Sequence, residues 1–299
     1  MLNPPLSLLS DDLLNYIVDH VAEFRDLFSF SFPFSNSNSN LHNLSITDRA
    51  FTRACQAYIF KDLRLGFGCR TKDSLSKRLV KIGNILNDEP SFANRVRTVH
   101  LGYTCTQNKW LFNDPNFITV FQLLAKSLMP PHKLCLIGDW ESFIIEDPIF
   151  FVGCLMQSFF SQTLTVLELT YCENVPLTLF LVCPNLKEVY LDGVEVFESG
   201  DDEYPDEQCY GRELPALELL NCRDSKGLVK QMITPPPKFS TAVAVWSKLR
   251  VLKLGPQEKE EVACVQPILD AACNTLEELC LFNRQDTWVA GEMWPFLSI

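Results

Sequence analysis

The chain has 299 residues, of which 47% are hydrophobic and 21% charged, so global disorder is excluded and a sizeable core can form. This length predicts one large domain or two smaller ones. The net charge of −11, from 26 basic and 37 acidic residues, argues against a surface that follows nucleic-acid phosphates. We therefore expect no nucleic-acid partner.

The cysteines and the N-terminus both indicate a cytoplasmic or nuclear protein. The 12 cysteines form no Cys-x-x-Cys pair, and we interpret them as reduced thiols of the core. The first residues lack the basic segment, apolar run and cleavage site of a signal peptide. The segment 148–167 carries no charge, but its polar second half favours a buried helix followed by a strand over a membrane span. No membrane association is expected.

The first element in chain order is a helix from Leu9 to Val21. Ser10 stands at the position of an N-cap, and the next two residues are acidic, which suits the first turn of a helix. The apolar residues recur at helical spacing and form a stripe along one face: Leu13, Leu14, Ile17, Val18 and Val21. Exposing all five would forgo on the order of 10 kcal/mol of burial free energy. The stripe therefore needs a partner surface, in this chain or in another protein.

A segment of low complexity, residues 25–43, follows this helix. Its phenylalanines alternate with Ser and Pro, and Asn then alternates with Ser. The aromatic alternation has the period of a strand, but Pro33 and the Asn/Ser tract favour a mobile loop. A peptide-like binding segment is the alternative interpretation. The next residues, 44–60, favour helix.

Two short patterns in the first 51 residues resemble the F-box. The first combines an acidic residue with spaced aliphatic residues: Leu9, Asp12, Leu13, Leu14, Ile17, Val18 and Val21. In the second, Arg49 matches a basic residue and Phe51 stands where Trp is usual. The continuation over residues 58–65 is similar to the segment that leads into the substrate-binding part of many fungal F-box proteins. Ser10 departs from the Leu-Pro pair of the family, and the loop 25–43 is longer than usual.

The F-box resemblance implies a small helical domain, residues 1–62, that docks on a Skp-type adaptor and through it on a cullin. The resemblance implies that the adaptor binds the residues at the positions of the family pattern, including Ser10, which stands where the family has Pro. They are Leu9, Ser10, Asp12, Leu13, Leu14, Ile17, Arg49 and Phe51.

Beyond residue 62 an apolar pattern, x-x-Leu-x-x-Leu-x-Leu, recurs six times. The copies begin at Val96, Leu164, Leu186, Leu217, Leu249 and Leu276. Residues 133–138 form a candidate seventh copy, and residues 63–65 a candidate first strand. In each copy the last two apolar positions alternate with a polar or exposed one, as in a strand with one buried face. Helix-favouring segments lie between the copies, at 72–86, 116–128, 148–160, 177–183 and 258–272.

This alternation of strand and helix predicts an α/β fold. Residues 63–299 are expected to form an irregular leucine-rich-repeat solenoid, with parallel strands alternating with helices, in which each unit buries its apolar face only against its neighbours. The copies are unevenly spaced, which indicates insertions such as the acidic segment 198–207. Cys183 and Cys273 each lie three residues before the first Leu of a copy, which resembles the cysteine-containing repeats of F-box proteins.

The residues between the inward-pointing positions should form a strip on the opposite face of the strands, where repeat proteins bind partners. The candidate substrate-binding residues on this strip are His100, Glu168, Thr170, Tyr190, Asp192, Asn221, Arg223, Lys253 and Phe282. The same alternation places Val166, Glu188, Leu219 and Val251 beside them. A solvent-exposed sheet without a partner is the alternative.

No residue pattern nominates an enzyme, a metal site or a cofactor. The four His do not pair with Cys or carboxylates at metal-ligand spacing, and nucleophile-elbow and phosphate-binding motifs are missing. The leading hypothesis is a substrate-recognition adaptor of an SCF-type (Skp-cullin-F-box) ubiquitin ligase that binds a protein substrate. The alternative is a leucine-rich-repeat scaffold whose N-terminal helices cap one end, with no ligase link. In a pure cap, Leu9, Leu13 and Ile17 would be covered by the chain's own residues.

Overall fold

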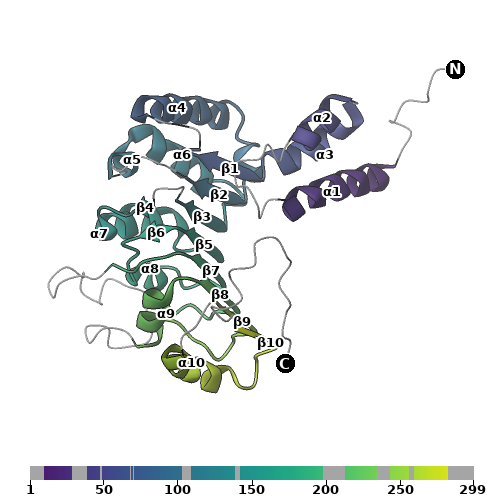
Figure 1. Ribbon diagram of the computed structural model, residues 1–299. Coiled ribbons are helices and arrows are strands. Elements are labelled where there is room, and N and C mark those ends of the chain that lie inside the picture. Colours follow the sequence, from purple (N-terminus) through teal and green to yellow (C-terminus); the bar gives the residue numbers. More distant parts are fainter. Residues whose placement is uncertain are drawn as a thin grey trace.

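The computed structural model describes most of the chain between residues 10 and 281. The described ranges are 10–28, 39–47, 49–67, 69, 71–102, 109–138, 142–197, 213–234, 243–255 and 259–281. The fold is mixed α/β, with three N-terminal helices followed by an eight-stranded sheet whose strands alternate with helices (Figure 1). The acidic segment 198–207 lies outside the described residues, as do the candidate site residues Leu9 and Phe282.

The N-terminal helices are α1 (Asp11–Phe28), α2 (Ser39–Thr47) and α3 (Arg49–Ile59). Ser10 caps α1 as predicted, because its Oγ accepts a hydrogen bond of 3.3 Å from the amide of Leu13. The predicted boundaries of the low-complexity loop are wrong, since α1 continues to Phe28 and α2 already begins at Ser39. Residues 29–38 of that segment lie outside the described ranges.

The helices α1, α2 and α3 have a small hydrophobic core of their own. Its buried members are Leu14, Val18, Leu41, Phe51 and Cys55. These residues form a cluster separate from the core of the sheet. The chain's own α2 and α3 therefore cover part of the apolar stripe of α1.

The main sheet is entirely parallel in its described ladders, and its spatial order follows the sequence. Its strands are β1 (Asp62–Leu65), β2 (Thr98–Leu101), β3 (Lys133–Ile137), β5 (Val166–Thr170), β7 (Glu188–Asp192), β8 (Leu219–Arg223), β9 (Val251–Leu254) and β10 (Glu278–Leu281). All six predicted strands are present, and both candidate copies, at 63–65 and 133–138, are strands too. The sheet is open, with β1 and β10 at its edges, and a short second sheet pairs β4 (Phe143–Ile144) with β6 (Cys172–Glu173).

Helices α4 to α10 lie along one face of the main sheet (Figure 1). They are α4 (Lys72–Asp88), α5 (Lys109–Asn113), α6 (Pro115–Ala125), α7 (Pro148–Phe151), α8 (Thr178–Leu181), α9 (Lys226–Ile233) and α10 (Lys259–Ala272), with a π-helix, η3 (Val152–Phe160), after α7 and a 3-10 turn, η2 (Ala93–Arg95), before β2. The predicted helices are all present, but 177–183 is reduced to a single turn. The sequence pattern did not indicate α9.

Local capping explains where several of these helices begin. Thr71 and Ser74 form a reciprocal capping box at the start of α4. Asp114 and Asp147 accept hydrogen bonds from amides of the first turns of α6 and α7, and each is followed by a proline, which suits the first helical position.

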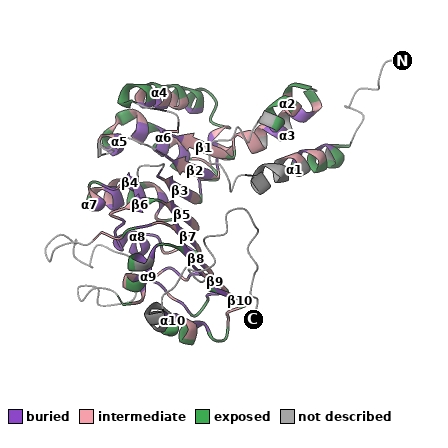
Figure 2. Ribbon diagram, viewed as in Figure 1, coloured by how far each residue is buried: buried purple, intermediate pink, exposed green. Residues whose placement is uncertain are grey.

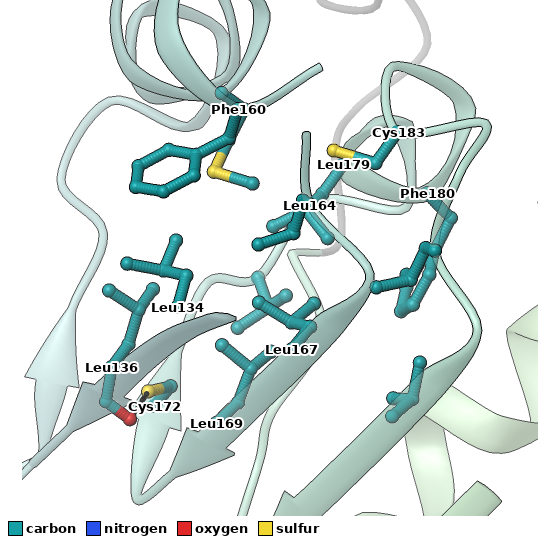
Figure 3. Packing of buried hydrophobic residues seen from close by; sticks show 14 of the residues in the cluster. Leu134, Leu136, Phe160, Leu164, Leu167, Leu169, Cys172, Leu179, Phe180 and Cys183 are labelled. Atoms are coloured by element: carbon teal, nitrogen blue, oxygen red, sulfur yellow. Dashed lines mark hydrogen bonds between the residues drawn. The ribbon is translucent and has the colours of Figure 1, made fainter. Parts of the chain in front are cut away.

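The core fills the space between the sheet and its helices. Equivalent apolar residues of neighbouring strands are paired in register, as in the row Val99, Leu134, Leu167, Val189, Leu220 and Leu252, all with 0% exposure. Figure 2 shows the strands largely buried and the outer surfaces of the helices exposed. Figure 3 shows how helix residues such as Phe160 and Phe180 pack against this layer. Each such side chain contributes about 1.5–3 kcal/mol on burial.

The cysteines are mostly core thiols, as predicted. The nine whose side chains the structure describes are all free, and seven of them are buried. Cys172 donates its thiol to the carbonyl oxygen of Leu136 at 3.5 Å (Figure 3). The interpretation is wrong for Cys273, which is exposed although Cys183, its counterpart in the repeat pattern, is buried.

A tight turn follows directly after each of three strands, β5, β7 and β8. Tyr171, Gly193 and Asp224 have positive φ angles of 49°, 62° and 48°. The amides of Gly138, Tyr171 and Gly193 each donate a hydrogen bond of 2.7–2.9 Å to the last carbonyl of the next strand. This hydrogen-bonded series aligns the turns along the carboxyl edge of the sheet.

We expect Gly138→Ala to destabilise the fold strongly. A Cβ at this position would overlap the carbonyl oxygen of Tyr171 and lie 2.7 Å from the backbone nitrogen of Phe143, so backbone would have to move. Such overpacking costs about 1–3 kcal/mol or more, measurable as a lower midpoint of urea unfolding. Gly153→Ala is the matched control, because its Cβ would meet no atom within 4 Å. Equal midpoints for the two variants would contradict the expectation.

Candidate functional site

The face of the sheet opposite the helices carries the side chains that alternate with the core positions. In the central row of this open face, each strand contributes one residue in register: Arg64, His100, Cys135, Glu168, Tyr190, Asn221, Lys253 and Cys280. These eight side chains lie side by side at the spacing of neighbouring strands, about 4.8 Å. The predicted alternation of inward and outward residues is confirmed by their partial burial in strands β5, β7, β8 and β9.

A hydrogen-bonded ion pair occupies the middle of the open face. The Nζ of Lys133 lies 2.9 Å from Oε2 of Glu168, and the thiol of Cys135 donates to the same oxygen at 3.4 Å. Burial acts to raise the pKa of Glu168, but the Lys133 ammonium outweighs it and the pKa lies below its ordinary value. Burial raises the pKa of Cys135 well above its ordinary value, so this thiol is protonated at neutral pH and is not a nucleophile.

His100 is the neighbour of Cys135 in the central row. Burial lowers the pKa of His100 to about 4, while the charge of Asp62 acts to raise it and that of Arg64 to lower it. The imidazole is therefore neutral at pH 7. It can donate one hydrogen bond and accept another toward a bound group.

Tyr190 contacts two charged residues of the open face, Glu188 on its own strand and Lys133 on β3. Its hydroxyl donates a hydrogen bond of 3.0 Å to Oε2 of Glu188, and its ring centroid lies 5.7 Å from Nζ of Lys133. Burial, followed by the charge of Glu188, raises the pKa of Tyr190 to about 12. The phenol is thus a donor held in one direction, with its ring half-buried between neighbouring strands.

The strands after β7 carry further charge pairs. The Nζ of Lys253 lies 2.8 Å from Oε1 of Glu278, and Arg223 faces Asp192 at a looser 3.9 Å. Burial raises the pKa of Asp192 despite the nearby Arg223. The cations Arg223 and Lys253 on this half of the face therefore each lie beside a carboxylate of a neighbouring strand.

The structure brings together most of the residues predicted for substrate binding. His100, Glu168, Tyr190, Asn221 and Lys253 belong to the central row. The other described candidates, Thr170, Asp192 and Arg223, pair in register one step toward the carboxyl edge. The prediction missed Lys133 and Cys135, because the third strand departs from the repeat pattern and was only a candidate copy.

The predicted adaptor-binding residues divide into two groups. Ser10, Asp12, Leu13 and Arg49 are exposed, with Leu13 at 44%, and Ile17 is half-buried against the helical core. Leu14 and Phe51, by contrast, are 7% and 3% exposed. Their assignment to a partner surface is corrected here: they hold α1 and α3 together. Tyr16 of α1 and Ile46 of α2 are exposed residues that the pattern did not single out, at 68% and 71%.

A groove on the helical side of the molecule has little of the chemistry of an active site. It has a volume of about 570 Å³ and lies between α5, α6 and the π-helix, with Phe112, Ile118, Phe150 and Phe159 in its walls. Its ionisable lining groups are Lys126 and the Cys154 thiol, whose pKa is raised by burial. Among the described residues, no three His, Cys, Asp or Glu side chains are placed to hold a metal ion.

No family model matches the chain, and no curated protein matches it either. In the part of the chain that the structure describes, no helix combines the length and apolar character needed to cross a bilayer.

We expect His100 to make the stability of the fold depend on pH. Its pKa is about 4 when folded and about 6.5 in an unfolded chain, so between these values the unfolded chain binds more protons. The stabilisation is complete above pH 6.5 and is lost as the pH falls toward 4. From pH 7 to pH 4.5 the wild type should lose on the order of 1–3 kcal/mol more than His100→Gln.

The measurement is the urea midpoint of both proteins across this pH range. Comparing slopes removes any constant cost of the substitution itself. His42→Gln serves as a control for the removal of an exposed imidazole. Parallel pH profiles for the wild type and His100→Gln would contradict the assignment.

Proposed function

We propose that the chain is the substrate-recognition adaptor of an SCF-type ubiquitin ligase. In this proposal the helical unit α1–α3 is a divergent F-box that binds a Skp-type adaptor and through it a cullin. The sheet and its helices are a leucine-rich-repeat solenoid that binds a protein substrate. The observation that carries the proposal is the exposure of Leu13 on a helical unit whose core is separate from that of the sheet.

The strand ladder supports the solenoid part of the proposal. Eight parallel strands follow one another in sequence order, and each apolar position pairs with its equivalent in the next strand. This is the arrangement expected when repeated units bury their apolar faces only against neighbours. The repeats are irregular because the helices vary in length and because two of the connections contain the short extra strands β4 and β6.

The adaptor would act through proximity alone. A substrate held on the open face, and a ligase held by the helical unit, raise each other's effective concentration without covalent chemistry by this chain. The raised pKa of Cys135 makes the thiol a poor nucleophile and the lowered pKa of His100 makes the imidazole a weak base, which fits a binding surface better than a nucleophile and base pair. The cross-strand pairs of the open face would present the substrate with side chains whose positions are already fixed by their partners.

The buried residues narrow the proposed adaptor surface. Leu14 and Phe51 fill the core of the helical unit, so the docking surface consists of exposed groups around Leu13, with Asp12 and Arg49 as its charged members. An exposed aliphatic side chain contributes little to folding but can bury most of its area against a partner.

The second candidate function is a scaffold whose helical unit is only an end cap. The junction between α3 and β1 favours it: the carbonyl of Lys61 accepts hydrogen bonds from the amides of Arg97 and Thr98, and the rings of Phe60 and Phe92 lie 4.5 Å apart. The residues that follow α3 thus pack against the segment that precedes β2, as they would beside an end cap. Exposure of Leu13 is the observation that sets the two candidates apart.

We expect Leu13→Asp to weaken binding to a purified Skp-type adaptor. A buried charge in place of an aliphatic contact at the centre of an interface should weaken binding about tenfold or more. Val80→Asp is the matched control. Val80 is 41% exposed, similar to Leu13, but it lies on α4, outside the helical unit. Calorimetric titration of the adaptor with each variant gives the two affinities.

Two outcomes would contradict the proposal. The first is that the wild-type chain does not bind the adaptor. The second is that it binds and Leu13→Asp binds equally well. A circular dichroism melt of each variant confirms that the helical unit remains folded, and Leu14→Asp, which places a charge in its core, marks the effect of unfolding.

A further inference from the structure

A row of basic residues lies at the amino edge of the sheet, on the first three strands. Lys61, Arg97 and His132 each stand immediately before a strand, β1, β2 and β3. The amide of Arg97 donates to the carbonyl of Lys61 at 2.8 Å, and the amide of His132 donates to that of Arg97 at 3.0 Å. The three side chains therefore start from adjacent positions on neighbouring strands.

These three residues have no carboxylate partner among the described residues. The guanidinium of Arg97 donates to the carbonyls of Met129 and Val96, at 2.8 and 3.2 Å, and not to an acid. Burial lowers the pKa of His132, and the cations Arg97, Lys61 and Lys133 lower it further. Lys61 and Arg97 are therefore two neighbouring cations without a carboxylate partner among the described residues, and they favour the neutral form of His132 beside them.

Farther along the amino edge, the charges at the equivalent positions neutralise one another. Before β7, β8, β9 and β10 the equivalent residues alternate in sign, and Lys187 pairs with Glu218 at 2.8 Å and Arg250 with Glu277 at 2.7 Å. Opposite charges on neighbouring strands stabilise a sheet, whereas like charges destabilise it. The uncompensated positive charge is confined to β1–β3.

Exposed apolar side chains adjoin this basic row. Leu128 and Met129, in the connection between α6 and β3, are 88% and 56% exposed. The connection is held in place, since the amide of Leu128 donates to Oδ1 of Asn94 at 2.9 Å and Arg97 bonds both the carbonyl and the sulfur of Met129. Covering an aliphatic side chain of this kind releases on the order of its full burial free energy.

We propose that this surface, defined by Lys61, Arg97, His132, Leu128 and Met129, binds an acidic peptide segment that carries aliphatic side chains on a partner protein. The carboxylates would pair with the cations, and the aliphatic groups would cover Leu128 and Met129. A nucleic acid fits less well, because it offers no aliphatic groups and the net charge of the chain opposes a long phosphate backbone. The surface is distinct from the open face and from Leu13, so the inference does not rest on the proposed ligase function.

The test uses the full chain and a fluorescein-labelled probe peptide, Asp-Glu-Leu-Glu-Leu-Asp-Glu, followed by fluorescence anisotropy. We expect saturable binding with a Kd on the order of 10–100 µM that weakens as salt is added. The double variant Lys61→Glu, His132→Glu should weaken binding about tenfold or more, since it reverses one cation and adds a second negative charge beside it. Leu128→Ser should weaken it about threefold through the loss of apolar contact.

The matched control is Lys77→Glu with Lys81→Glu. Both residues are exposed on α4, away from the amino edge, and the pair adds at least as much negative charge. Its affinity should remain within about twofold of the wild type, because Lys81 lies about 10 Å along the helix from the end of α4 at Asp88, and Lys77 farther, which exceeds the screening length of about 8 Å at physiological salt. A circular dichroism melt verifies that each variant is folded.

Four outcomes would overturn the inference: no saturable binding of the probe, an equal loss in the control variant, equal affinity for a probe with Ser in place of Leu, or tighter binding of an oligouridine than of the peptide. The last two would assign the surface to anions in general or to nucleic acid.

Discussion

The parallel register between neighbouring strands is the constraint on which the other features of the molecule depend. Leu134, Leu167 and Val189 face the helices only because each pairs with its equivalent in the next strand. A slip of one residue would turn these side chains to the open face and place Lys133 and Glu168 in the core. Burying that pair without its hydrogen bonds would cost several kcal/mol, on the order of the stability of a whole domain. Apolar register and surface charge are therefore set together.

The register also determines what the open face can recognise. Lys133 on β3 meets Glu168 on β5 because their strands are neighbours, and the ring of Tyr190 on β7 is the next group along. Half-buried pairs of this kind are screened less by solvent than exposed ones, so their side chains lose mobility. A partner would meet a surface whose charges are already satisfied. Selectivity then depends on matching the hydrogen-bond donors and the shape, and an unmatched polar group would be left unpaired on binding.

Much of the fold could be predicted from the sequence because one face of each strand is buried. The Leu spacing located the main strands, and even the weak copy at 133–138 is a strand, since Leu134 and Leu136 keep the period although Cys135 replaces a polar residue. The helix α9 was missed because it spans only 8 residues, too few for the buried Leu228, Val229 and Met232 to establish a helical period. The single turn α8 was predicted too long, because the buried segment around it is apolar throughout and periodicity cannot mark its ends.

The candidate site was less predictable than the fold, because it depends on how elements far apart in the sequence pack together. An apolar stripe says that a helix needs a partner, but not which residues of the stripe face which partner. In α1 the stripe divides between Leu14 and Val18, which pack on α2 and α3, and Leu13, which does not. That division depends on the angle at which three helices pack, which no local pattern encodes. The charge pairs of the open face have the same origin, because Lys133 and Glu168 are separated by a helix and meet only through strand order.

At the amino edge of the sheet, the charges of neighbouring strands are paired on one half and unpaired on the other. Where Lys187, Glu218, Arg250 and Glu277 alternate in sign, neighbouring strands attract one another and the edge is complete without a partner. Before β1 and β2 the equivalent positions hold the cations Lys61 and Arg97, so folding leaves a repulsion of about a few tenths of a kcal/mol between them that the sheet must offset elsewhere. The lowered pKa of His132 limits further repulsion by keeping the imidazole neutral more of the time. An anionic group bound at this edge would remove what remains, so the free energy of binding would include the relief of a strain that the fold itself creates.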